Sequence, residues 1–148
     1  MSENLPIAKE RFIKRLVDLC VKNKLPGLPK DELDQHIILK SVVLTLGQHG
    51  VMTEKEINEK LEYWISHVDP NENVDRVTLR RRLVDVGYLT RAKDGSSYQV
   101  SLSGSRPQFF EQAIDQVDVV AAIASAREEI VRRKKEYLQK AKSQGEDK

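Results

Sequence analysis

Three segments decide the fold of this chain: residues 53–56 (TEKE), 78–85 (TLRRRLVD) and 88–100 (YLTRAKDGSSYQV). The first predicts a helix start, because the Thr53 hydroxyl can accept a hydrogen bond from the Glu56 backbone while the Glu56 side chain reaches back. The second predicts a basic helix. The third predicts a hairpin around its Asp-Gly pair, since glycine tolerates a positive φ. Helix, helix and two-stranded ribbon is the order of a winged helix-turn-helix, which presents a basic helix to a DNA major groove.

The rest of the chain is predicted to be mainly helical, so the fold class is mainly α with a small β-hairpin. Apolar periodicity, capping residues and turn residues place the elements. The predicted helices cover residues 6–24, 31–48, 53 onward, 75–86 and 107–142, and the predicted strands cover residues 88–91 and 98–102. We expect an N-terminal helix and linker over residues 1–29, a winged-helix-like domain over 30–104, and a long C-terminal helix with a polar tail over 105–148.

Composition indicates a soluble, cytoplasmic protein. Cys20 is the single cysteine of 148 residues, which excludes an internal disulfide framework and favours a reducing compartment. The N-terminus lacks the basic start and apolar run of a signal peptide. The apolar runs are too short to span a bilayer.

Positive charge is concentrated in the middle of the chain. Residues 1–75 carry 10 basic and 13 acidic side chains, residues 76–106 carry 7 and 2, and residues 107–148 carry 8 of each. The net charge of +5 over the predicted basic helix and wing attracts polyanions even though the whole chain is only +2.

DNA is the expected partner of the basic helix and the wing. On a helical wheel Arg80 lies between two apolar patches, so we expect its stem to be packed and its guanidinium to be paired. Arg81 points outward and Arg82 lies at the flank, where each could contact phosphate or guanine. The candidate nucleic-acid contacts are Arg76, Thr78, Arg81, Arg82, Arg91 and Lys93.

A second interpretation of the same surface is a protein-interaction adaptor that binds no nucleic acid. Arg81 and Asp85 have the i, i+4 spacing of an ion pair, in which case neither would be available to a ligand. Asp85 on the outward face would also repel phosphate. The acidic N-terminal half of the chain favours this alternative, and the local charge of +5 favours DNA.

Catalytic and metal sites are not expected, and no cofactor is implied. Ser96 and Ser97 are interpreted as turn residues, because no histidine or lysine is placed nearby to activate them. Three histidines, His36, His49 and His67, lack the spacing of metal ligands. Cys20 lies on an apolar helix face and is expected to be a buried thiol. Trp64 and Tyr98 are expected to serve packing rather than base stacking.

The C-terminal helix is predicted to mediate homodimerisation. Its candidate contact residues are Val117, Ala121, Ala124 and Val131, which lie near one seam around an alanine cluster. The alternative is that Phe109, Phe110 and Ile114 fold back on the first two helices while the remainder stays solvated. Residues 127–142 carry 7 basic and 3 acidic side chains, so this part could also contact nucleic acid or an acidic partner.

The stretch from residue 53 to residue 100 resembles an uncharacterised bacterial family defined by a domain of unknown function. Members have the form T-E-x-E-[VI]-N, then T-L-R-R-x-L-V-D-x-G-[LY]-L-x-R, then D-G-S-x-Y. The three motifs occur here in order over residues 53–58, 78–91 and 94–98. Because this domain often accompanies transcriptional regulators, the resemblance implies a regulatory, winged-helix-like module. The loop over residues 66–73 and the long C-terminal helix depart from the pattern.

Overall fold

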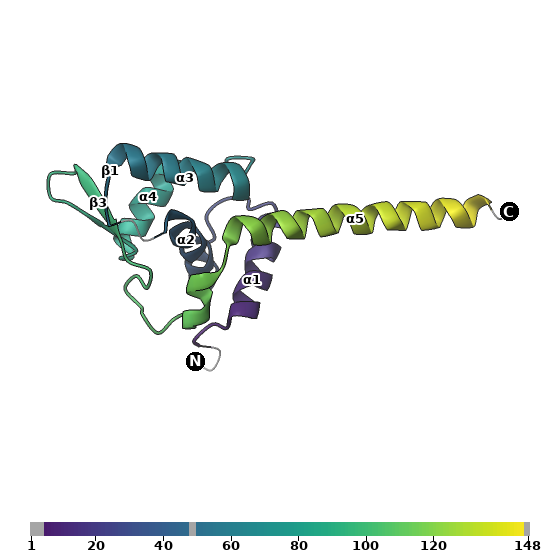
Figure 1. Ribbon diagram of the computed structural model, residues 1–148, viewed down its shortest axis with the longest axis horizontal. Helices are drawn as coiled ribbons and strands as arrows, with labels where there is room; N and C mark the ends of the chain where they lie inside the picture. Colours follow the sequence, from purple (N-terminus) through teal and green to yellow (C-terminus); the bar gives the residue numbers. More distant parts are fainter. Residues whose placement is uncertain (1–4, 48–49, 147–148) are drawn as a thin grey trace.

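The computed structural model describes residues 5–47 and 50–146, and it is mainly helical with a small antiparallel sheet at one end (Figure 1). Its elements in chain order are α1 (Lys9–Val17), η1 (Asp18–Lys22), α2 (Glu32–Leu46), β1 (Val51–Thr53), α3 (Glu54–Val68), α4 (Arg76–Asp85), β2 (Leu89–Arg91), β3 (Ser97–Val100), η2 (Gln112–Gln116) and α5 (Val119–Glu146).

Helix α2 is the centre of the core. The sequence predicted one apolar face, whereas residues 36–43 are buried without interruption, so the helix is covered all round. Its start is capped by Asp31, whose carboxylate accepts from the Asp34 amide at 3.0 Å. The Ser41 hydroxyl accepts from the buried Trp64 indole at 3.1 Å. This bond ties α2 to α3 and confirms the packing role of Trp64.

The sheet has three strands rather than the predicted two. Strand β1 pairs antiparallel with β3, which also pairs with β2, so the order is β1-β3-β2. Strand β1 was not predicted, because three residues between a loop and a helix start carry almost no periodicity. Tyr98 is buried in β3, which confirms its packing role. Ser97 lies in β3 rather than in the turn, where Ser96 bonds to the Asp94 carboxylate.

Local signals set the starts and ends of α3 and α4. The predicted capping box of α3 is confirmed, with the Thr53 amide 3.1 Å from the Glu56 carboxylate and the Glu56 amide 3.1 Å from the Thr53 hydroxyl. Asp75 caps α4. Gly87 ends α4 with a φ of +86°, in the left-handed region that glycine enters without strain.

The first helix begins later in the chain than the sequence predicted. It was predicted from residue 6, but α1 starts at Lys9 and continues into the π-helical turn η1. Ile7 forms a parallel bridge with Phe110, with backbone hydrogen bonds of 2.9 Å to Phe109 and from Glu111. The segment before α1 therefore pairs with a distant part of the chain, a contact that no local pattern reveals.

The prediction of one unbroken helix from residue 107 was wrong. Phe109 and Phe110 are buried in non-helical backbone, and the ring of Phe110 meets that of Phe12 edge-on at 5.7 Å. Next comes the short 3-10 helix η2, which buries Ile114. Helix α5 starts only at Val119, where the Asp118 carboxylate accepts from the Ala121 amide at 3.1 Å. The part of the alternative in which Phe109, Phe110 and Ile114 fold back on the core is confirmed, and the solvated state of the rest of the helix stays a prediction.

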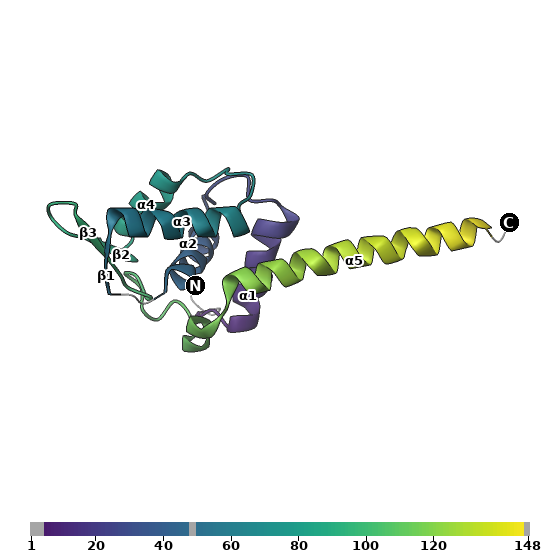
Figure 2. The same ribbon diagram turned by 45° about the horizontal axis from the view of Figure 1, so that its top comes forward.

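Helix α5 leaves the body as a projecting arm. Its first turns bury Val119 and Ile123 against the core, whereas residues 131–143 are exposed throughout. Figures 1 and 2 show this half extending far beyond α1 and α3. Among the described residues, no helix combines the length and apolar character that crossing a lipid bilayer requires.

Candidate nucleic-acid interface

Helix α4 and the β2–β3 hairpin lie in the part of the molecule away from the projecting arm (Figure 1), and their residues line one groove. Leu79 and Leu83 bury the inner face of α4 in the core. The outer face therefore presents Val77, Thr78, Arg81 and Asp85 to solvent.

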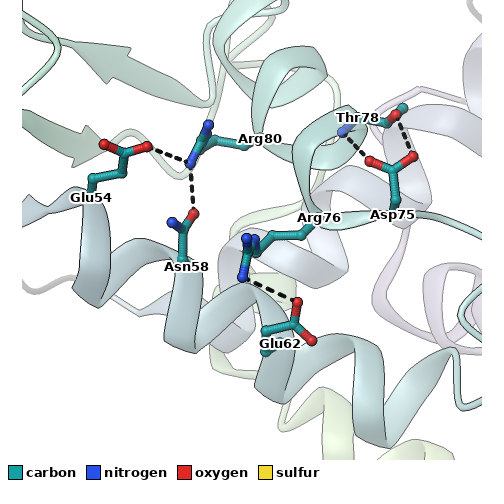
Figure 3. Close-up of polar contacts among 7 residues, drawn as sticks. All are labelled: Glu54, Asn58, Glu62, Asp75, Arg76, Thr78 and Arg80. Carbon is teal, nitrogen blue, oxygen red and sulfur yellow. Dashed lines mark hydrogen bonds and ion pairs between the residues drawn. The ribbon is translucent and has the colours of Figure 1, made fainter.

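Two arginines of α4 point back to α3 rather than outward, as Figure 3 shows. The Arg80 guanidinium lies 2.7 Å from the Asn58 side-chain oxygen, 3.2 Å from the Glu54 carboxylate and 5.7 Å from the Tyr98 ring centre. Its side chain is only 19% exposed, which confirms that it is packed and paired. Arg76, predicted as a nucleic-acid contact, forms an ion pair with Glu62 at 3.4 Å.

Thr78 and Arg82 also have partners within the protein. The Thr78 amide and hydroxyl each donate to the Asp75 carboxylate at 2.8 Å (Figure 3), and these bonds lower the pKa of Asp75. Arg82 donates from Nε to the Gln35 side-chain oxygen at 2.6 Å. Thr78 therefore helps to start α4, and Arg82 joins its far end to α2.

Arg81, Arg91 and Lys93 are the predicted contact residues whose side chains are exposed and available. In the part of the chain that the structure describes, no hydrogen bond or ion pair engages these three side chains. The i, i+4 ion pair between Arg81 and Asp85, weighed above as an alternative, does not form within those residues. Arg81 on α4 and the two wing residues are therefore the cations that this surface can offer to a ligand.

A groove of about 340 Å³ runs between α4 and the β2–β3 hairpin. It is lined by Glu54, Val77, Arg80, Arg81, Val84, Asp85, Arg91 and Tyr98. Two of these residues, Val77 and Glu54, were not among the site residues predicted from the sequence. Val77 is 56% exposed. Glu54 comes from the start of α3, which only the folded chain brings to this groove.

Two further chemically versatile side chains, His36 and Cys20, are buried in the core. Burial lowers the pKa of His36, whose Nδ1 lies 3.0 Å from the buried Tyr88 hydroxyl. Cys20 is buried, which raises the pKa of its thiol to about 12 and leaves it a poor nucleophile. Within the described residues, no three His, Cys, Asp or Glu side chains gather as a metal site requires, and His49 lies outside those residues.

The predicted dimer contacts are placed along the start and middle of the arm. Ala121, Ala124 and Val131 are exposed on α5. Val117 is instead half-buried in extended backbone ahead of the helix, because α5 begins at Val119. Homodimerisation stays a prediction.

A family comparison covers the central part of the chain. The model of a family described as "Uncharacterized protein conserved in bacteria (DUF2087)" matches residues 24–100, from the loop after η1 through β3. No curated protein and no solved structure matches the chain. Because the match covers more than half of the sequence, the chain belongs to this uncharacterised bacterial family.

Proposed function

We propose that residues 30–104 are a winged helix-turn-helix domain that binds DNA and regulates transcription. The chain order α2-β1-α3-α4-β2-β3 supports this, with α3 and α4 as the helix pair and the β2–β3 hairpin as the wing. Strand β2 contacts α4, and residues of α4 and of the hairpin line one groove, so the hairpin lies beside this helix. Such a domain places its second helix in the major groove.

The observation that carries the proposal is that Arg81 of α4 and Arg91 of the β2–β3 hairpin, both exposed, line the same groove. Arg81 lies on the outer face of α4, and Arg91 and Lys93 lie on the adjacent wing. With Arg76 and Arg80 turned toward α3, the outer face of α4 keeps room for base edges. Arg81 contacts the major groove, while Arg91 and Lys93 follow the phosphate backbone, the usual division between reading and positioning.

The side chains around Arg81 match chemical groups on base edges. An arginine in the major groove binds guanine O6 and N7 with two hydrogen bonds. The exposed Val77, four residues earlier on the same face, can contact a thymine methyl group. Asp85, four residues later, can accept from a cytosine amino group. On this account Asp85 contributes to base recognition rather than opposing DNA.

A salt titration of DNA binding tests the proposal. Binding of the full chain to a fluorescent mixed-sequence duplex is measured by anisotropy between roughly 50 and 200 mM salt. Each phosphate contact contributes a slope of about −0.9 to log K against log salt, so two to three contacts give about −2 to −3. Replacing Lys93 with Ala should reduce the slope by about one contact. Absence of binding at the lowest salt would refute the proposal.

An adaptor that binds protein through the same groove is the second candidate. The observation in its favour is the groove itself, where Val77 and Val84 are flanked by the carboxylates of Glu54 and Asp85. The substitution Val77→Ser distinguishes the adaptor from the DNA-binding protein. It should reduce affinity for a protein partner strongly but affinity for mixed-sequence DNA little, because phosphate contacts dominate non-specific binding.

A further inference from the structure

The arm of α5 carries an apolar seam that continues beyond the edge of the body. Ile123 is buried in the core. Seven and eight residues on, Ile130 and Val131 are 39% and 64% exposed. Seven further on, Tyr137 and Leu138 are 70% and 58% exposed. Repetition every seven residues keeps these side chains on one face of a helix, as in a two-stranded coiled coil.

The seam joins a groove at the base of the arm. This groove has a volume of about 410 Å³ and is lined by Cys20, Val21, Lys24, Pro70, Asn71, Arg127, Ile130 and Val131. Arg127 fixes the helix here, because its guanidinium donates to the backbone oxygens of His67 at 2.6 Å and Val68 at 3.2 Å. The groove and the seam therefore form one surface, which begins where Arg127 holds α5 against the body.

The charge along the arm selects the partner. Residues 130–142 carry six basic side chains and one acidic, a net charge of +5. On the helical wheel, Arg133 and Lys140 lie on one side of the seam, Lys135 and Lys142 lie on the other, and Lys134 lies within it. Arg133 also forms an ion pair with Glu129 at 2.6 Å, so the three lysines at the flanks are the main charges for a partner. A second copy would bring a stretch of +5 against a stretch of +5. Like charges at the flanking positions oppose pairing, so they argue against the homodimer that was predicted from the sequence. Acidic flanks on a partner helix would complement them.

We propose that the distal half of α5, with the groove at its base, is the docking site for an acidic amphipathic helix of another protein. The partner helix pairs with the seam over about two heptads, and its carboxylates face the flanking lysines and arginines. Its apolar end enters the groove beside Ile130 and Val131. This site lies at the opposite end of the molecule from α4 and the wing (Figure 2), so both surfaces can be occupied together.

The width of the seam favours a helix over a membrane or nucleic acid. Helices that lie on membranes have a broad apolar face. Here Lys134 lies between the apolar pair at residues 130 and 131 and the pair at residues 137 and 138, so the apolar face is narrow. Nucleic-acid phosphates would use the basic residues but would leave Val131, Tyr137 and Leu138 in water.

A synthetic peptide tests the proposal. The peptide has four heptads with leucine at the two core positions and glutamate at the flanking positions, so that it repels itself and is poorly helical alone near pH 7. Mixed with the full chain, it should gain helicity by circular dichroism and bind at micromolar concentration by anisotropy. Val131→Asp with Leu138→Asp should weaken binding at least tenfold.

The control is Ala121→Asp with Ser125→Asp, which changes the charge of α5 equally on its exposed opposite side and should leave binding unchanged. Thermal melts show that both variants remain folded. The proposal is overturned if the peptide fails to bind, if the seam and control variants bind it alike, or if the same peptide with lysine in place of glutamate binds equally well. It is also overturned if light scattering shows that the arm pairs with a second copy, or if phosphatidylserine vesicles bind the chain through the seam and the peptide does not.

Discussion

Arg80 and Arg81 are neighbours in α4, but their side chains have different surroundings. Arg80 lies over Tyr98 and bonds to Asn58 and Glu54, whereas Arg81 is exposed. The helical wheel of α4 predicted this difference, because Arg80 falls between two apolar patches. It could not predict that Arg76 pairs with Glu62, since that contact requires α3 and α4 to lie side by side.

We predict that Arg80→Ala destabilises the protein more than Arg81→Ala. The first change removes a packed stem and a hydrogen bond to Asn58, at a cost of about 1–2 kcal/mol. The second removes an exposed side chain and should change stability by less than about 0.5 kcal/mol. Urea unfolding of both variants measures the difference. Equal effects would mean that Arg80 is not structural.

The buried His36 should make stability depend on pH. Burial lowers its pKa, so the unfolded chain binds this proton more tightly than the folded protein does. The free energy of unfolding is therefore unaffected by His36 above the unfolded pKa of about 6.5. Below that pH it falls as His36 takes up a proton on unfolding, by at most about 1.4 kcal/mol per pH unit.

We predict that His36→Gln flattens the rise of the urea midpoint between pH 5 and pH 7.5. Asp69, whose pKa burial raises, acts in the opposite direction, but it is present in both proteins and cancels in the comparison. An unchanged pH profile in the variant would exclude His36 as the source.

Among the elements, those with local signals could be predicted from the sequence and those that depend on distant contacts could not. The capping box of α3, the arginine helix α4 and the Asp-Gly hairpin are specified within a few residues each. Strand β1 and the Ile7–Phe110 bridge form by pairing with remote segments. The start of α5 was misplaced because residues 107–118 contain nothing that forbids helix, while burial of Phe109 and Phe110 holds them in another conformation.

The capping box offers a test at the scale of one element. Thr53→Ala removes the hydroxyl that accepts from the Glu56 amide, which should cost roughly 1 kcal/mol. Thr90→Ala, an exposed threonine of β2 without a capping role, is the control and should cost less than about 0.5 kcal/mol. Thermal melts of both variants decide whether the cap stabilises α3 as its geometry indicates.

At the scale of the whole molecule, the C-terminal region has a part that packs in the core, before Glu129, and a part that projects into solvent, after it. We expect only the first part to be needed for folding. A chain ending at Arg106 loses Phe109, Phe110, Ile114, Val119 and Ile123, all buried. Removing a large buried side chain costs about 2–5 kcal/mol each, which together exceeds the stability of a typical domain. We predict that this chain does not fold. A chain ending at Glu129 should keep its melting temperature within a few degrees, and a large loss would show that the arm supports the body.

Recognition of DNA by α4 and the wing is the central claim, and matched charge reversals test it most directly. The double variant Arg81→Glu with Arg91→Glu reverses two positive charges at the proposed DNA interface. Lys14→Glu with Lys22→Glu changes the charge equally on α1 and η1, away from α4 and the wing (Figures 1 and 2). Affinity for a mixed-sequence duplex at about 100 mM salt is measured for both. The interface variant should lose at least tenfold in affinity while the control loses little. Equal losses in the two variants would contradict the claim.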